Sequence, residues 1–456
     1  MAAAIDRDLT SGPISGHFRA LAIPAAVGML FSTLYNVVDV YFAGQISTDA
    51  QAGLAVGFQA FFINMAVGFG LGAAMSALVG KAKGSKDEGG ARCLAVQGMG
   101  LGVLMTAALM VIAVWLGPAL ITLVSEPGAY RDAGTGYFNW LIFALPGFLL
   151  AYAGNGVLQA RGDTKSLQRA LVVAFFANVG LNPLFIYGIP GVIPGIGFNG
   201  IALSTIVSQT GVMCYILYQL FGRKIMKGLS LAEFKPDLAI WRVVLTQMWP
   251  TSLSIAVMFM TGFVIQFYLK GFGGSAVAAY GIALRVEQIM LLPVLGMTGA
   301  LLPIAAQNFG AENPVRVREA LFFCWKLGFA MMLVACPTLW FGAEWAMGLF
   351  TSDPEVIRVG VSYLHVDGFV LPFYMMLFSI NSFLQAMQKP IWMLAIGVYR
   401  QGIAVALFVW LFVGLLGFDV WGVWFGVAVA VISGWVLAMF VAQRVARQEI
   451  GGLWSR

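Results

Sequence analysis

The sequence predicts an all-α polytopic membrane protein with twelve transmembrane helices, arranged as two six-helix bundles related by a pseudo-two-fold axis along the membrane normal. Its composition, its recurring apolar runs and an internal repeat predict this class. Of the 456 residues, 60% are hydrophobic and only 10% are charged, whereas a soluble domain carries about 25% charged residues. A bilayer suits this composition because it replaces a charged surface with apolar side chains. The composition therefore excludes a soluble enzyme.

The apolar runs define the expected elements. Each run is close to or above the roughly 20 residues that cross a hydrocarbon core about 30 Å thick. The expected spans cover residues 18–43, 52–80, 93–117, 133–158, 167–188, 198–221, 241–269, 276–309, 317–348, 357–387, 391–416 and 421–444. The expected domains are a cytoplasmic N-terminal tail (1–17), an N-terminal six-helix lobe (18–221), a cytoplasmic linker (222–240), a C-terminal six-helix lobe (241–444) and a cytoplasmic tail (445–456).

The distribution of Lys and Arg predicts how these spans are oriented. An even number of spans places both termini on one side, and loops rich in Lys and Arg mark the cytoplasmic side. The opposite face has only Arg131, Lys270 and Arg358, whereas Arg285 and Arg400 lie at membrane depth. We therefore expect a multi-pass protein of the cytoplasmic (inner) membrane with both termini in the cytoplasm. The net charge of +6 follows this topology, so no nucleic-acid partner is expected.

The two halves of the chain repeat each other. Four landmarks recur at an offset of 226 residues: Pro24 with Pro250, Gly84 with Gly310, Pro146 with Pro372, and Leu158–Ala160 with Leu384–Ala386. Because each half holds six spans, the second half enters the membrane in the same direction as the first. Transporters use this parallel arrangement, with the substrate path between two rocking lobes. The polar linker is the expected hinge between the lobes.

Three segments carry a resemblance to a known family. Tyr35–Gly44 (YNVVDVYFAG), Leu158–Lys165 (LQARGDTK) and Pro303–Ala311 (PIAAQNFGA) resemble the multidrug and toxic compound extrusion (MATE) exporters, and more closely the DinF-like than the NorM-like branch. The resemblance covers essentially the whole chain. It implies export of small amphipathic, often cationic drugs and toxins by a protein that is not an enzyme and has no cofactor. Inward flow of H⁺ or Na⁺ would drive this export.

Asp39 is the main candidate for ion coupling. It lies inside span 1, where a carboxylate is costly unless it faces a hydrated cavity or takes up a proton. A group that alternates between these states as its water access changes can couple ion flow to transport. The alternative is an interfacial Asp near a helix end that lipid headgroups solvate. The resemblance favours the coupling role, since a span 1 Asp in this motif is the coupling residue of such exporters.

Span 5 offers polar partners for Asp39. Asn178 and Asn182 are four residues apart and project from one helical face, and Thr205 with Ser204 in span 6 can add hydroxyl groups. The alternative is that these amides only hold the bundle together through hydrogen bonds between helices. In coupled relatives the second amide position is often an Asp. With a single carboxylate a bound cation is less well compensated, so we favour H⁺ and keep open a Na⁺ site at Asp39, Asn178 and Asn182. No other metal site is expected.

Further intramembrane features are less specific. Pro24 removes a backbone hydrogen bond and makes a bending point in span 1. In the resembling family a bend of this span accompanies protonation, although Pro24 can equally be a static kink. In the C-terminal lobe, Glu287, Arg285 and Arg400 are candidates for a cavity, and Glu287 needs either a cation such as Arg400 or water. His365 and Asp367 are expected at headgroup level, without a role.

Two functions are compared. The favoured one is a secondary active antiporter that works by alternating access, functions as a monomer and contacts the lipid bilayer and its drugs. The alternative is a lipid-linked precursor flippase of the wider superfamily. Flippases of that type usually carry fourteen spans and a cationic cavity, whereas this chain has twelve expected spans and only Arg285 and Arg400 at membrane depth. The exporter is therefore preferred.

Overall fold

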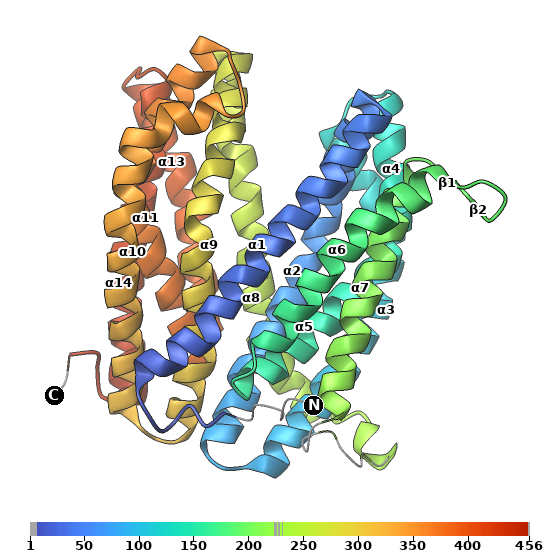
Figure 1. The fold of residues 1–456 in the computed structure, drawn as a ribbon. Helices are drawn as coiled ribbons and strands as arrows, with labels where there is room; N and C mark the ends of the chain where they lie inside the picture. The colour runs from blue at the N-terminus through green and yellow to red at the C-terminus, as the bar shows by residue number, and fades with distance from the viewer. Residues whose placement is uncertain (1–6, 223–225, 227–228, 230, 455–456) are drawn as a thin grey trace. The chain divides into compact units, whose positions relative to one another are not determined.

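The computed structural model describes residues 7–222, 226, 229 and 231–454, and in this part of the chain twelve helical segments are long and apolar enough to cross a membrane (Figure 1). The predicted all-α fold is thus confirmed. Nine segments are single helices: α1 (Ile14–Ile46), α2 (Thr48–Gly84), α3 (Glu88–Val124), α6 (Lys165–Tyr187), α7 (Asn199–Phe221), α9 (Gly274–Gly310), α10 (Pro314–Gly348), α11 (Pro354–Ala386) and α14 (Val420–Ile450). A tenth consists of α8 (Leu238–Leu269) and the 3₁₀ turn η3 (Lys270–Phe272) that follows it.

The remaining two segments, spans 4 and 11, are interrupted helices. Span 4 consists of α4 (Ala129–Leu141), the 3₁₀ turn η1 (Ile142–Ala144) and α5 (Leu145–Ala160), and Pro146 lies in the first turn of α5. Span 11 combines α12 (Pro390–Gly397) and α13 (Val405–Val409) with the π-helical segments η4 (Val398–Ala404) and η5 (Trp410–Leu415). A short antiparallel hairpin of β1 (Gly188–Ile189) and β2 (Ile193–Pro194) joins α6 to α7.

The internal repeat is visible in the helix bounds and in their packing. α2 ends at Gly84 and α9 ends at Gly310, 226 residues later. Within its unit, α2 packs against α3, α4 and α5, and α9 packs in the same way against α10 and α11. The matched landmarks in the sequence therefore reflect matched helices.

The chain forms two compact units, and their boundaries differ from the expected lobes. Unit 1 comprises Met1–Leu9 and Val27–Ser252, and unit 2 comprises Thr10–Ala26 and Leu253–Arg456. Two of the three boundaries cut through a helix: one divides α1 after Ala26 and the other divides α8 after Ser252, in each case two residues after the proline of that helix. The third boundary, between Leu9 and Thr10, lies before α1. The beginning of α1 belongs to the C-terminal unit, and the beginning of α8 belongs to the N-terminal unit.

Close glycine contacts explain this exchange of helix ends. A Cβ atom on Gly296 of α9 would lie 2.9 Å from the Ala26 nitrogen and 3.0 Å from the Ala22 oxygen, so the backbone of α1 packs directly on α9 in unit 2. In unit 1, a Cβ atom on Gly70 of α2 would lie 2.9 Å from the Met248 oxygen of α8. Glycine permits this close approach because it has no side chain.

The described part of the linker is fixed to unit 1. Its 3₁₀ turn η2 (Leu231–Phe234) carries Glu233, whose carboxylate accepts two hydrogen bonds from Arg92 of α3, at 2.7 and 2.9 Å. Gln97 donates to the backbone oxygens of Glu233 and Lys235 and accepts from the Asp237 nitrogen. Residues 223–225, 227–228 and 230 of the expected hinge lie outside the described residues. These hydrogen bonds hold residues 233–237 of the linker against α3.

Candidate functional site

Asp39 lies on α1, where its side chain is only 5% exposed. Its position is seven residues before the end of the helix, about 10 Å along the axis at roughly 1.5 Å per residue. Its Oδ1 atom accepts hydrogen bonds from Asn178 Nδ2 at 3.0 Å and from Asn182 Nδ2 at 2.8 Å. The carboxylate therefore points toward α6 within unit 1, and the structure does not support a headgroup-solvated Asp.

The amide and hydroxyl partners form one network. Asn178 and Asn182 are both fully buried on the face of α6 that meets α1, as their spacing predicts. Thr205 Oγ1 of α7 lies 3.4 Å from Asp39 Oδ2, and Asn178 Nδ2 also donates to Ser204 Oγ at 3.2 Å. The structure thus brings together all four residues that we predicted for ion coupling, from three different helices.

The network extends to Tyr35, which the sequence analysis did not identify as a site residue. The Tyr35 hydroxyl and Ser208 Oγ share a hydrogen bond of 2.6 Å, and both side chains are buried. Tyr35 lies four residues before Asp39, so both side chains project from one face of α1. This spacing of four residues could have identified Tyr35 from the sequence as a neighbour of Asp39.

The electrostatics of the site restrict what it can bind. The Asp39 carboxylate accepts hydrogen bonds from two amide groups and one hydroxyl group, and no Lys or Arg among the described residues forms an ion pair with it. Asn182 Oδ1 is buried without a hydrogen-bond partner, whereas Asn178 Oδ1 accepts from Asn182. A proton needs only one oxygen and a nearby acceptor, while Na⁺ needs several oxygen ligands. Beyond the carboxylate, Asn182 Oδ1 is one further oxygen of this network that is buried without a hydrogen-bond partner.

The C-terminal unit contains a second buried acid. Glu287 of α9 is 6% exposed, and it accepts a 2.6 Å hydrogen bond from the Tyr363 hydroxyl of α11. Arg285 is exposed, so the two residues point to different sides of the helix as expected. Arg400 instead lies over the Tyr374 ring, 5.5 Å from its centroid, and no ion pair between Arg400 and Glu287 occurs in the described chain. The sequence left open a cation or water as the partner of Glu287, and in the structure the hydroxyl of Tyr363 is its hydrogen-bond donor.

Asp367 is a further correction. It was expected at headgroup level, yet it is 4% exposed and its Oδ2 atom is buried without a hydrogen-bond partner. The reason is depth, because α11 begins at Pro354 and thirteen residues of helix rise about 20 Å. Asp367 follows Tyr363 by one helical turn, which repeats the spacing of Tyr35 and Asp39.

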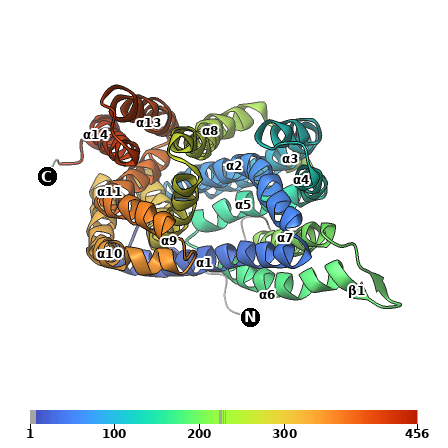
Figure 2. The same cartoon turned by 90° about the horizontal axis from the view of Figure 1, so that it is seen from above.

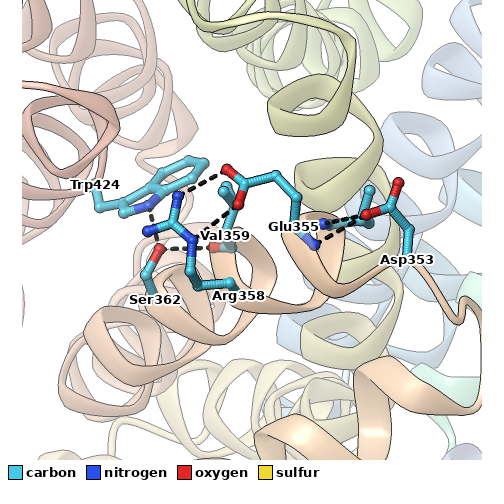
Figure 3. A network of polar contacts seen from close by, with 7 residues as sticks. Asp353, Glu355, Arg358, Val359, Ser362 and Trp424 are labelled. Atoms are coloured by element: carbon cyan, nitrogen blue, oxygen red, sulfur yellow. Dashed lines mark hydrogen bonds and ion pairs between the residues drawn. The ribbon is translucent and has the colours of Figure 1, made fainter.

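Polar contacts fix the beginning of α11 and link it to α14 (Figure 3). Asp353 Oδ1 accepts from the backbone nitrogens of Glu355 and Val356, which caps the helix. Further along, Trp424 Nε1 of α14 donates to Ser362 Oγ at 3.0 Å. The Trp424 ring also packs edge-on against Tyr363, with centroids 5.0 Å apart. These contacts orient the tyrosine that binds Glu287.

Comparison with known proteins agrees with this architecture. The sequence profile of the MatE family matches residues 24–184 and 250–411, which are the two repeats and begin at Pro24 and Pro250. A relative described as an FAD transporter from Shewanella oneidensis is 26% identical over 77% of each chain. The multidrug export protein MepA of Staphylococcus aureus is 21% identical over 78% of this chain and 77% of its own.

A solved structure shares the fold. The structure of a MOP superfamily transporter from Pyrococcus furiosus superposes with a TM-score of 0.90 and 22% identity, over 98% of this chain and 99% of that chain. The two profile matches cover well over half of the 456 residues. The chain therefore belongs to the MATE family of membrane transporters, whose members are not enzymes.

Proposed function

We propose that this protein is a secondary active multidrug exporter, an antiporter that extrudes amphipathic, often cationic compounds in exchange for H⁺. The single observation that carries this proposal is the buried carboxylate of Asp39, which two amides hold and which no Lys or Arg of the described chain pairs with. Its relatives include proteins described as multidrug exporters, such as MepA. The protein would act as a monomer in the cytoplasmic membrane, with both termini in the cytoplasm.

The coupling follows from the cost of burying a charge. An unpaired carboxylate in a low-dielectric site is costly, so Asp39 favours its protonated form when closed off from water and its ionised form when hydrated. A proton and a cationic drug both neutralise this charge. Binding of one therefore weakens binding of the other, and this linkage is reciprocal. Alternating access to the two sides of the membrane would then convert proton entry into drug exit.

We propose Pro24 as the point at which α1 bends. It lies inside α1, two residues before the division between the two units, and fifteen residues before Asp39. A proline removes one backbone hydrogen bond and lowers the cost of bending there. Pro250 has the same position in α8, a helix whose described residues contain no acid. We propose that α1 couples bending to the charge of Asp39, while α8 provides only the bend.

H⁺ is favoured over Na⁺ as the coupling ion. Asn182 stands where a second carboxylate would compensate a bound cation, and its neighbour Asn178 already uses its own carbonyl oxygen. The DinF-like branch remains our assignment within the family. The runner-up function, a lipid-linked precursor flippase, would need cations to bind pyrophosphate. Arg400 is stacked on Tyr374 and Arg285 is exposed, so the flippase has less support than the exporter.

Transport in proteoliposomes tests this function. H⁺ and Na⁺ gradients are imposed separately, and efflux of a cationic dye, of FAD and of a lipid-linked oligosaccharide is followed for the wild type and for Asp39→Asn. We expect dye efflux driven by the H⁺ gradient alone and lost in Asp39→Asn. Efflux that follows only the Na⁺ gradient would overturn the proposed ion. Movement of only the lipid-linked substrate would support the flippase.

A further inference from the structure

The hairpin between α6 and α7 has a well-defined turn and an apolar surface. The turn Ile189–Val192 closes with a 3.0 Å hydrogen bond from the Val192 nitrogen to the Ile189 oxygen. Pro190 and Gly191 occupy its central positions, and Gly191 has φ +75°. This is the sequence and geometry of a type II turn, in which proline presets the first central residue and glycine tolerates the positive φ of the second.

The base of the hairpin is tied to the last turn of α6. The Ile196 nitrogen donates to the Phe185 oxygen at 2.9 Å, and the Gly197 nitrogen donates to the Ile186 oxygen at 3.1 Å. A Cβ atom on Gly195 would lie only 2.6 to 2.7 Å from backbone atoms of Ile186 and Tyr187, so the return strand passes directly over the helix end. The hairpin therefore has a defined direction.

Three described apolar side chains of the hairpin are exposed. Val192 is 73% exposed, Tyr187 62% and Ile189 44%. No Asp, Glu, Lys or Arg occurs between Arg169 and Arg223, so the hairpin and its flanking loop carry no charge. A loop that faces bulk water is normally polar or charged. Figures 1 and 2 both show the hairpin extending away from the helices of its own unit.

The surface of the hairpin continues the apolar face of α6. Val173 is 68% exposed and Phe176 is 63% exposed. Tyr187 lies fourteen and eleven residues after them, close to whole numbers of turns at about 3.6 residues per turn, so it shares their helical face. α6 has 23 residues and a length of about 34 Å, slightly more than a hydrocarbon core. Tyr187 and the hairpin therefore fall at the level of the headgroups, where tyrosine is enriched.

We propose that this hairpin, residues 187–196, inserts the side chains of Tyr187, Ile189 and Val192 into the interfacial layer of the lipid bilayer on the predicted outer face. Three observations carry the proposal: a rigid turn, an exposed apolar surface without charge, and continuity with the exposed apolar face of a spanning helix. The second half of the chain has no equivalent element, because Leu416–Asp419 connects η5 directly to α14. The anchor thus belongs to unit 1 alone.

Fluorescence of a labelled cysteine tests the proposal. Val192→Cys is made in a variant whose cysteines Cys93, Cys214, Cys324 and Cys336 are replaced, and which retains dye efflux. An environment-sensitive label (NBD) is attached, and the protein is reconstituted in phosphatidylcholine and phosphatidylglycerol vesicles. Glu126→Cys, an exposed position at the end of α3 on the same predicted face, is the matched control. Ile189→Cys serves as a second hairpin position.

We expect the labels at Val192 and Ile189 to emit at shorter wavelength than the label at Glu126. Spin-labelled lipids should quench the hairpin labels, and aqueous iodide should quench the control. Equal iodide quenching at Val192 and Glu126, without lipid quenching, would overturn the proposal. Shielding from iodide without lipid quenching would also overturn it, because a second copy of the chain or another protein would then cover the hairpin.

Discussion

Replacing Asp39 by asparagine and by alanine separates its structural role from its proposed coupling role. Both replacements remove the charge, so the difference between the two variants reports only the hydrogen bonds and the lost volume. Asparagine keeps an oxygen where Asp39 Oδ1 accepts from Asn178 at 3.0 Å and from Asn182 at 2.8 Å. Its amide group can donate to Thr205 Oγ1, which lies 3.4 Å from Asp39 Oδ2.

Alanine leaves these buried donors without their acceptor. A buried polar group that loses its partner costs about 1–3 kcal/mol. Both amides keep a second contact at 3.2 Å, Asn178 with Ser204 and Asn182 with Asn178. The loss of stability for each amide is therefore expected at the lower end of this range. We expect Asp39→Ala to be less stable than Asp39→Asn by about 1–3 kcal/mol, and both to lose H⁺-driven efflux.

Thermal unfolding in detergent measures the first expectation, and dye efflux from proteoliposomes measures the second. Equal stability of the two variants would show that the amides do not depend on Asp39. The hydrogen-bond network would then be refuted as the feature that holds the carboxylate. Wild-type efflux by Asp39→Asn would leave the network intact and refute the coupling role, so the two failures are distinguishable.

Three further predictions test other parts of the account. Asn182→Asp supplies a second carboxylate, and we expect Na⁺ to stimulate its efflux; an unchanged response to Na⁺ in the vesicle assay would contradict our reading of this position. Tyr363→Phe removes the 2.6 Å donor to Glu287 and should lower stability by about 1–3 kcal/mol in thermal unfolding, whereas Tyr218→Phe at an exposed site should not. Gly296→Ala places a Cβ atom 2.9 Å from the Ala26 nitrogen and should cost about 1–3 kcal/mol. Gly299→Ala on the same helix meets nothing within 4 Å and should be neutral or stabilising; similar losses in both would refute the close packing.

Much of the fold could be predicted because membrane spans are a property of local composition. Every expected span matches one helical segment. Most ends agree to within a few residues, but α3 continues to Val124, beyond the expected end at residue 117, and α14 continues to Ile450, beyond the expected end at residue 444. The repeat was also visible, since Gly84 and Gly310 end equivalent helices. The exchange of helix ends between the units was not visible, because it depends on backbone contacts at Gly296 and Gly70 that are distant in sequence.

The site around Asp39 was predictable from helical spacing, which put Asn178 and Asn182 on one face. The second buried acid was only half predicted. Glu287 was identified from its depth in the span, but its hydrogen-bond donor Tyr363 was not predicted. Composition could not identify this donor, because a tyrosine in a spanning helix is usually interpreted as a packing residue. Asp367 was misplaced because its distance from the helix end was underestimated.

The most direct test of the central claim is the proton release that accompanies drug binding to the purified protein. Calorimetry in buffers of different ionisation enthalpy measures this release. If Asp39 exchanges its proton for a cationic drug, binding to the wild type releases protons, and binding to Asp39→Asn releases fewer. Equal proton release from the wild type and from Asp39→Asn would contradict the account.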